Sequence, residues 1–208
     1  MKIRTEILEP DCFYHIFNRG INKQKIFLTN ENYLYFLRQV KKYLISVVDI
    51  YAYCLMPNHF HLLLKIKPSK KLEKTTTKNI NNSIGLHSFD KIISKQLGKL
   101  FSSYTQAFNK MNNRSGALLD SPFKRIKIDS EKYLINNIIY IHQNPIDFKK
   151  YKYSSYQSVL SKLPTNIMRN EIIEIFDDVN NYVFCHKKII DFNRLFKINF
   201  QLCQSFKL

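Results

Sequence analysis

The sequence lacks the features that mark secreted or membrane-spanning proteins. No apolar run is long enough to cross a bilayer, and the opening residues Met1–Arg4 contain no signal-peptide core. The four cysteines show no CxxC spacing, so neither a disulfide framework nor a zinc knuckle is indicated. We therefore expect a cytoplasmic protein that has no membrane partner.

Acidic residues are also scarce. The chain of 208 residues has 16 Asp and Glu against 33 Lys and Arg, which gives a formal net charge of +17 and a pI of about 9.7. This excess of positive charge favours a polyanionic partner, and nucleic acid before membrane. Hydrophobic residues make up 45% of the chain, so a sizeable core is available. The length suits one compact domain with appendages.

Hydrophobic periodicity predicts alternating strands and helices. Strands are expected at residues 13–17, 47–55, 59–66 and 123–128, and helices at 30–44, 89–111 and from 129 or 130 to 144. The turn Met56-Pro57-Asn58 joins two strands so tightly that they must be antiparallel neighbours. The order β-α-β-β-α-β followed by a helix predicts an α+β, ferredoxin-like antiparallel sheet.

The remaining segments carry weaker signals. Residues 67–83 are polar and rich in lysine, which predicts a loop. We expect residues 1–160 to form the main domain and residues 161–208 a mostly helical C-terminal appendage. Within the appendage, helices are predicted from near Ile172 and over residues 189–196.

The first segment that carries chemistry is His59-Phe60-His61. Alternate side chains on a strand point to the same face, so both imidazoles project together while Phe60 points the other way. Two aligned imidazoles on the open face of a sheet can chelate a divalent metal. The alternative is that the two histidines are ordinary surface residues that bind no metal.

The second segment is the helix around residues 133–145. At helical spacing, one side carries a polar stripe and the other an apolar one. The polar stripe consists of Tyr133, Asn136, Asn137, Tyr140 and Asn144, and it lies opposite Leu134, Ile138 and Ile141. Tyr140 and Asn144 are i,i+4 neighbours and can reach one target, as a nucleophile beside a metal ligand. The alternative is an amphipathic helix with a half-buried tyrosine.

Taken together, these segments resemble the HUH nucleases. The similarity is greatest to the single-tyrosine transposases of the IS200/IS605 type, especially their REP-associated relatives. The matching stretches are residues 14–20, 52–63, 103–109, 140–145 and 153–156, and they occur in the family's order. The string Met-Pro-Asn-His-Phe-His at residues 56–61 is the most specific of them.

The resemblance implies a set of roles. His59 and His61 match the metal-binding pair, Asn144 the third metal ligand, and Tyr140 the nucleophile. Tyr104 and Tyr133 are rival nucleophiles. Tyr104 lies on an apolar stripe, and Tyr133, although Asn137 follows it at the same spacing, is not the tyrosine that matches the family's motif. The other histidines, at positions 15, 87, 142 and 186, receive no catalytic role, and His15 is expected to pack or hydrogen bond beside the site.

The resemblance also implies a reaction and its partners. Mg²⁺ or Mn²⁺ would be the cofactor, and the substrate would be single-stranded DNA that carries a hairpin. Cleavage would give a 5′-phosphotyrosine and a free 3′-hydroxyl, and the reverse step would transfer strands. The family includes both homodimers and monomers. Basic side chains are predicted to contact the DNA: Arg19, Lys23, Arg114, Lys124, Arg125 and Lys127.

Two other classes of function remain as alternatives. The same order of elements builds RNA-recognition domains, and a domesticated relative could bind DNA hairpins without catalysis. An RNA-binding domain would need stacking aromatics where the third strand carries histidines. A zinc hydrolase is disfavoured because no acidic general base accompanies the histidine pair.

Overall fold

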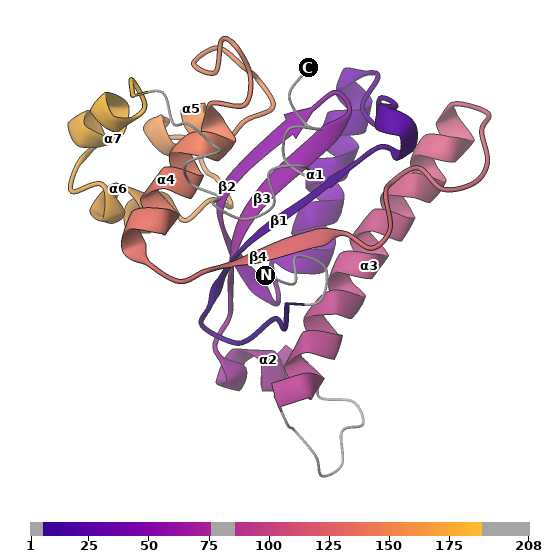
Figure 1. Cartoon of the computed structure of the whole chain (residues 1–208), viewed down its shortest axis with the longest axis horizontal. Helices are drawn as coiled ribbons and strands as arrows, with labels where there is room; N and C mark the ends of the chain where they lie inside the picture. The colour runs from indigo at the N-terminus through magenta and orange to yellow at the C-terminus, as the bar shows by residue number, and fades with distance from the viewer. Residues whose placement is uncertain (1–5, 76–85, 189–208) are drawn as a thin grey trace.

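Four antiparallel strands form the centre of the protein, as the computed structural model in Figure 1 shows. The structure describes residues 6–75 and 86–188. The strands are β1 (Phe13–Arg19), β2 (Val48–Met56), β3 (His59–Ile66) and β4 (Lys124–Ile128), in the order β2-β3-β1-β4. Every neighbouring pair is antiparallel. This arrangement confirms the predicted ferredoxin-like, α+β fold.

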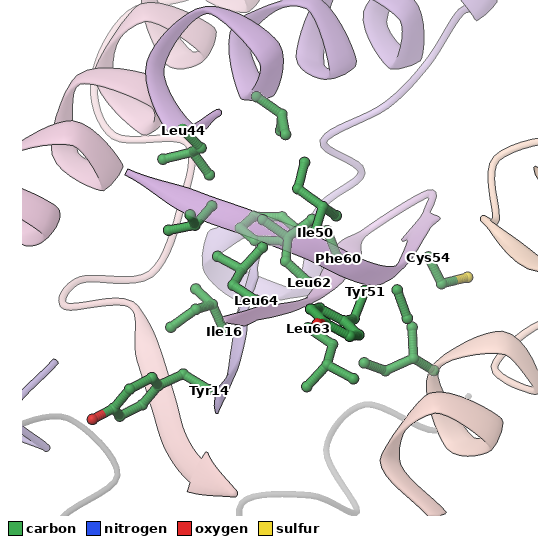
Figure 2. Packing of buried hydrophobic residues seen from close by; sticks show 14 of the residues in the cluster. Tyr14, Ile16, Leu44, Ile50, Tyr51, Cys54, Phe60, Leu62, Leu63 and Leu64 are labelled. Atoms are coloured by element: carbon green, nitrogen blue, oxygen red, sulfur yellow. The ribbon is translucent and has the colours of Figure 1, made fainter. Parts of the chain in front are cut away.

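One face of the sheet is covered by two long helices, α1 (Asn30–Leu44) and α3 (Leu86–Met111). Phe60 of β3 packs between them, with ring centroids 5.0 Å from Phe36 and 5.4 Å from Phe101. Figure 2 shows how Phe60, Leu62 and Leu64 contribute to the buried core. The apolar half of β3 therefore faces α1 and α3, as its alternation predicts.

The opposite face of the sheet carries the helix α4 (Glu131–His142). Ser130 is its N-cap, and the Ser130 side chain accepts a hydrogen bond from the backbone N–H of Tyr133. α4 packs on β2 and β3. This packing puts the predicted tyrosine helix over the histidines of β3.

Most predicted boundaries agree with the structure to within a few residues, and β3 agrees at both ends. The predicted loop 67–83 is wrong in part, because residues Ser69–Thr75 form the helix α2. Leu72 is fully buried and anchors this helix to the core. One apolar residue among lysines gives too weak a periodicity to reveal a helix.

The C-terminal segment packs against the edge of β2. It contains the short helices α5 (Tyr156–Leu160), α6 (Arg169–Ile175) and α7 (Val179–Cys185). Ile167 forms a parallel bridge with Ile50, and Ser154 an antiparallel bridge with Cys54. The helix predicted near Ile172 is present as α6, whereas the one predicted over residues 189–196 lies outside the described residues. The division at residue 160 stays a prediction.

Candidate active site

His59 and His61 lie on the face of β3 that α4 covers. In the sheet register, His59 is opposite Arg19 and His61 is opposite Phe17. The expectation of an open face is wrong, because the exposed fractions of His59 and His61 are only 4% and 1%. Buried polar groups need partners, so the contacts of these two imidazoles define the site.

The hydrogen bonds of His59 fix its tautomer. Its Nδ1 lies 2.6 Å from Oδ1 of Asn58, an atom that can only accept, so Nδ1 carries the proton. Nε2 of the neutral ring then presents a lone pair. This Nε2 lies 3.4 Å from Oδ1 of Asn144, whose Nδ2 donates to the backbone carbonyl of Tyr140 at 3.0 Å. Two lone pairs are therefore aimed at each other, an arrangement that a cation between them would stabilise.

His61 is held in a similar way. Its Nδ1 lies 2.8 Å from Nε2 of His15 on the neighbouring strand β1. A histidine that ligates a metal usually donates its other ring N–H to such a partner, which fixes the ring orientation. His15 therefore acts through a hydrogen bond beside the site, as expected from its place on β1. Asn144 also lies close enough to His61 to raise the pKa of its imidazole, so its amide influences both histidines of β3.

Tyr140 completes the cluster. Its ring centroid lies 5.5 Å from that of His61 and 6.1 Å from that of His15, edge to face in both cases. The side chain is half-buried. The backbone of Tyr140 is tied to the Asn144 side chain one turn later. The structure thus brings His59, His61, Tyr140 and Asn144 together, although they come from two elements about 80 residues apart in the chain.

Burial keeps the imidazoles neutral. It lowers the pKa of His59 to about 4; the Asn144 oxygen opposes this shift, because it would accept a hydrogen bond from the protonated ring, and the nearby charge of Arg19 reinforces it. Burial also lowers the pKa of His61 well below its usual value and that of His15 to about 3. Neutral imidazoles are the form that binds a metal, so at neutral pH the pair needs no deprotonation.

The donor set fits a divalent metal that accepts nitrogen and amide oxygen. Within residues 6–75 and 86–188, no group of three or more His, Cys, Asp and Glu side chains could hold a metal ion. A metal at this site would therefore depend on the amide of Asn144 as its third protein ligand, beside His59 and His61. Such a set suits Mn²⁺ or Mg²⁺ with further oxygen ligands from water and phosphate.

The rival tyrosines lie elsewhere. Tyr104 belongs to α3 on the other face of the sheet, is only 1% exposed, and donates a hydrogen bond to the backbone carbonyl of Ile26. Burial raises its pKa far above the usual value, which disfavours a phenolate. Tyr133 is half-buried on α4, about two helical turns before Tyr140.

Three of the basic residues predicted to contact DNA lie at or near the end of the sheet that carries His59. Arg19 is opposite His59 and forms an ion pair of 2.9 Å with Asp120. Lys23 is exposed and is the last residue of the 3-10 turn Ile21–Lys23. Arg114, in the loop after α3, donates a hydrogen bond of 2.6 Å to Asn109. Arg19 is thus the cation that the structure places beside the candidate site.

The three basic residues of β4 are placed differently. Lys124 is 1% exposed, and its Nζ lies 5.9 Å from the ring centroid of Phe17, so its ammonium does not reach the surface in this structure. Arg125 pairs with Asp90 at 3.2 Å, and Lys127 pairs with Glu9. Successive side chains of a strand point to opposite faces of the sheet, so Lys124 points to one face and Arg125 to the other. Contacts of these residues with DNA stay predictions.

Two site features were not identified from the sequence. Asn58 was interpreted only as a turn residue, yet it fixes the tautomer of His59. Its position directly before His59 was the available signal. The second feature is a histidine pair at the end of α4: Nδ1 of His142 lies 2.9 Å from Nε2 of His186, and Gln143 donates to the His186 carbonyl. The C-terminal segment therefore holds the end of the tyrosine helix.

Asn137 is the one residue of the polar stripe that is fully buried. Its amide nitrogen and oxygen make no hydrogen bond to any residue that the structure describes. We expect Asn137→Leu to raise the free energy of unfolding by about 1–3 kcal/mol, because it removes an unsatisfied buried amide. Urea denaturation measures this change, with the half-buried neighbour in Asn136→Leu as control. A lower midpoint for Asn137→Leu would show that the amide is hydrogen bonded in solution.

Comparisons with known proteins bear on this arrangement. Residues 9–83 match the family described as "Transposase IS200 like". A solved structure of a REP-associated tyrosine transposase bound to a REP hairpin is similar at 13% sequence identity, covering 77% of this chain and 87% of the other, with a TM-score of 0.48. A search of curated proteins found no match. None of the helices in the described residues is long and apolar enough to cross a membrane.

The fold and the site define a ferredoxin-like domain in which paired histidines on a central strand face a tyrosine helix. Residues 9–83, which include His59 and His61, are similar to the IS200-like transposase family. Tyr140 and Asn144 lie outside the matched residues, so their roles rest on the geometry described above.

Proposed function

We propose that the protein nicks single-stranded DNA in a metal-dependent reaction and transfers the cut strand through a tyrosine-linked intermediate. The observation that carries the proposal is the convergence of the lone pairs of His59 Nε2 and Asn144 Oδ1, beside the Tyr140 ring. His59, His61 and Asn144 would hold Mg²⁺ or Mn²⁺. When bound, such an ion polarises the scissile phosphate and offsets its developing negative charge.

Each protein group then has a defined task. The Tyr140 hydroxyl loses its proton to solvent and its oxygen attacks the phosphorus. The bond from phosphorus to the 3′-oxygen breaks, and that oxygen takes up a proton, which leaves a 5′-phosphotyrosine and a free 3′-hydroxyl. Because one phosphodiester replaces another, attack by a second 3′-hydroxyl rejoins strands. Arg19 lies where a neighbouring phosphate could pair with its guanidinium.

The partner that this chemistry requires is an accessible phosphodiester, which a single strand beside a folded hairpin provides. An RNA-recognition function is less well supported, because Phe17 on the same face is only 2% exposed and does not offer its ring to a base. A homodimer is compatible with the proposal and is not required by it, since the four site residues belong to one chain.

The test is covalent capture. The protein is incubated with Mn²⁺ and a pool of labelled single strands that carry one hairpin and randomised flanks. We expect a labelled adduct that survives denaturation, is lost when the metal is chelated, and is absent with Tyr140→Phe.

Tyr133→Phe is the matched control, because it removes a hydroxyl from the same helix and should retain the adduct. If the wild-type protein forms no adduct with any member of the pool but still binds it, the non-catalytic hairpin-binding alternative is favoured. An adduct that persists in Tyr140→Phe and disappears in Tyr133→Phe would move the nucleophile to Tyr133.

A further inference from the structure

A buried chain of hydrogen bonds joins the end of α4 to the C-terminal segment. Nε2 of His142, the last residue of α4, lies 2.7 Å from Oγ of Ser155, and its Nδ1 lies 2.9 Å from Nε2 of His186. Nδ1 of His186 lies 2.7 Å from the backbone carbonyl oxygen of Tyr182 in α7, a helix that Figure 1 shows beside α4. Ser155, His142 and His186 are all fully or almost fully buried. We call these three residues the clamp.

The direction of each hydrogen bond in the clamp follows from its ends. Enclosure favours neutral imidazoles, and a carbonyl oxygen can only accept, so His186 donates from Nδ1 to Tyr182 and presents a lone pair at Nε2. His142 then donates from Nδ1 to that lone pair, and its own Nε2 accepts the proton of the Ser155 hydroxyl. The Ser155 oxygen in turn accepts from the backbone N–H of Tyr53 in β2 at 2.9 Å. The clamp therefore connects the end of α4 to β2 on one side and to α7 on the other.

Aromatic rings surround the clamp. The rings of Tyr156 and Tyr182 stack with centroids 5.5 Å apart, and His142 lies edge-on to both, at 5.8 and 6.2 Å. The ring of Phe176 lies 5.8 Å from that of His186. In such low-dielectric surroundings, a satisfied network of hydrogen bonds is strong and holds one arrangement of its members. Because the clamp has almost no exposed surface, its effect on a reaction must pass through α4.

The proposed metal ligand Asn144 lies two residues after the clamp histidine of α4. The helix ends at His142 and Gln143 is its C-cap, so Asn144 lies outside the regular helix. The side chain of Gln143 also points to the C-terminal segment, where its Nε2 donates to the backbone carbonyls of His186 at 2.9 Å and Lys188 at 2.7 Å. Both residues that precede Asn144 are therefore held by hydrogen bonds to the C-terminal segment.

We propose that the clamp positions Asn144 as a metal ligand, so that docking of α7 and binding of the metal stabilise each other. This inference rests on the proposed function, because it takes Asn144 as the third ligand beside His59 and His61. Oδ1 of Asn144 lies 3.4 Å from Nε2 of His59. Metal sites tolerate errors of only about 0.2 Å in ligand distances, so a shift at the end of α4 would separate the two ligands.

The coupling between the clamp and the metal is reciprocal. If the docked clamp raises the affinity for the metal, the bound metal must stabilise the docked clamp by the same factor. The members of the clamp are positioning residues, which act through Asn144 and touch neither the metal nor the DNA. A merely structural role would lower stability without this reciprocity, which gives the proposal its tests.

The first experiment breaks the clamp at Ser155. Ser155→Ala removes the donor to His142, and we expect Mn²⁺ affinity, measured by isothermal titration, to fall about tenfold, as when a group that orients a metal ligand is removed. Ser154→Ala is the matched control and should keep wild-type affinity. Ser154 is only 3% exposed, but its hydroxyl accepts from the backbone N–H of Tyr156 in α5 and not from α4. Wild-type affinity in Ser155→Ala would overturn the proposal.

The second experiment separates positioning from a general loss of stability. In an Asn144→Ala background, Ser155→Ala should cause no further loss of Mn²⁺ affinity, because the ligand that the clamp positions is already gone. Effects of independent sites would instead multiply. An equal loss from Ser155→Ala in the wild-type and Asn144→Ala backgrounds would therefore contradict the proposal.

Hydrogen exchange measures the reciprocal effect on α7. The backbone N–H groups of Tyr182 and His186 donate to the carbonyls of Asp178 and Tyr182. Saturating Mn²⁺ should slow their exchange by about the same tenfold factor in the wild type and leave it unchanged in Asn144→Ala. Mn²⁺ binding with unchanged exchange in α7 would overturn this inference alone, whereas a wild type that binds no Mn²⁺ would overturn the proposed function as well.

Discussion

Replacing His61 by leucine should abolish binding of Mn²⁺ and lower the rate of adduct formation by about 100- to 1,000-fold, the usual cost of removing one group that stabilises a transition-state charge. The reason is geometric. His61 hydrogen bonds His15, and its ring lies beside Tyr140. Leucine fills much of the same space but offers no lone pair. Isothermal titration with Mn²⁺ measures the first effect and a time course of adduct formation the second.

The chain provides a matched control for this change. His186, like His61, is 1% exposed and hydrogen bonds another histidine, His142, at nearly the same distance. His186→Leu should therefore disturb stability to a similar degree and reduce Mn²⁺ affinity far less than His61→Leu, because His186 pairs with His142 and is not one of the three proposed metal ligands. Wild-type affinity for Mn²⁺ in His61→Leu would rule out the metal site proposed here, whatever happened to cleavage.

Acid should unfold the protein steeply between pH 6.5 and about pH 4. Burial lowers the pKa of His15 to about 3 and those of His59 and His186 to about 4, whereas unfolded imidazole titrates near 6.5. Above pH 6.5 these three histidines are mostly neutral in both the folded and the unfolded protein. Below it the unfolded state binds protons that the folded state does not, so the free energy of unfolding falls as pH falls.

The size of this effect follows from the number of histidines. Each lowers the free energy of unfolding by about 1.4 kcal/mol per pH unit within that window, so these three give about 4 kcal/mol per pH unit. Urea denaturation at several pH values measures the slope. His186→Leu removes one of these titrating groups, so it should lower the slope by at least about 1.4 kcal/mol per pH unit. A free energy of unfolding that stayed constant from pH 6.5 to pH 5 would show that the imidazoles are protonated in the folded state.

The sequence predicted the elements of the site well and their surroundings poorly. Alternation along β3 and the i,i+4 spacing of Tyr140 and Asn144 are local properties, and they gave the correct faces. The tautomer of His59 depends on Asn58, and the orientation of His61 depends on His15, which is 46 residues away. Contacts of this kind depend on the packing of strands and cannot be derived from spacing.

Burial was the other property that the sequence did not reveal. The predicted contact of Lys124 with DNA stays a prediction, but the sequence did not reveal that this lysine is buried beside Phe17, on the face of the sheet that α4 covers. Asn137 belongs to a stripe that is polar in sequence, yet it is completely enclosed. Whether a polar residue on a strand or helix is enclosed depends on which elements cover it, and these came from distant parts of the chain.

The bridges from Ile167 and Ser154 to β2 have a consequence for self-association. A sheet grows by offering the backbone groups of an outer strand to another chain. At the β2 edge, Ile167 and Ser154 of the same chain already pair with the strand, which hinders the addition of a strand from a second copy. Copies that joined through a continuous sheet would therefore have to meet at the opposite margin, along β4.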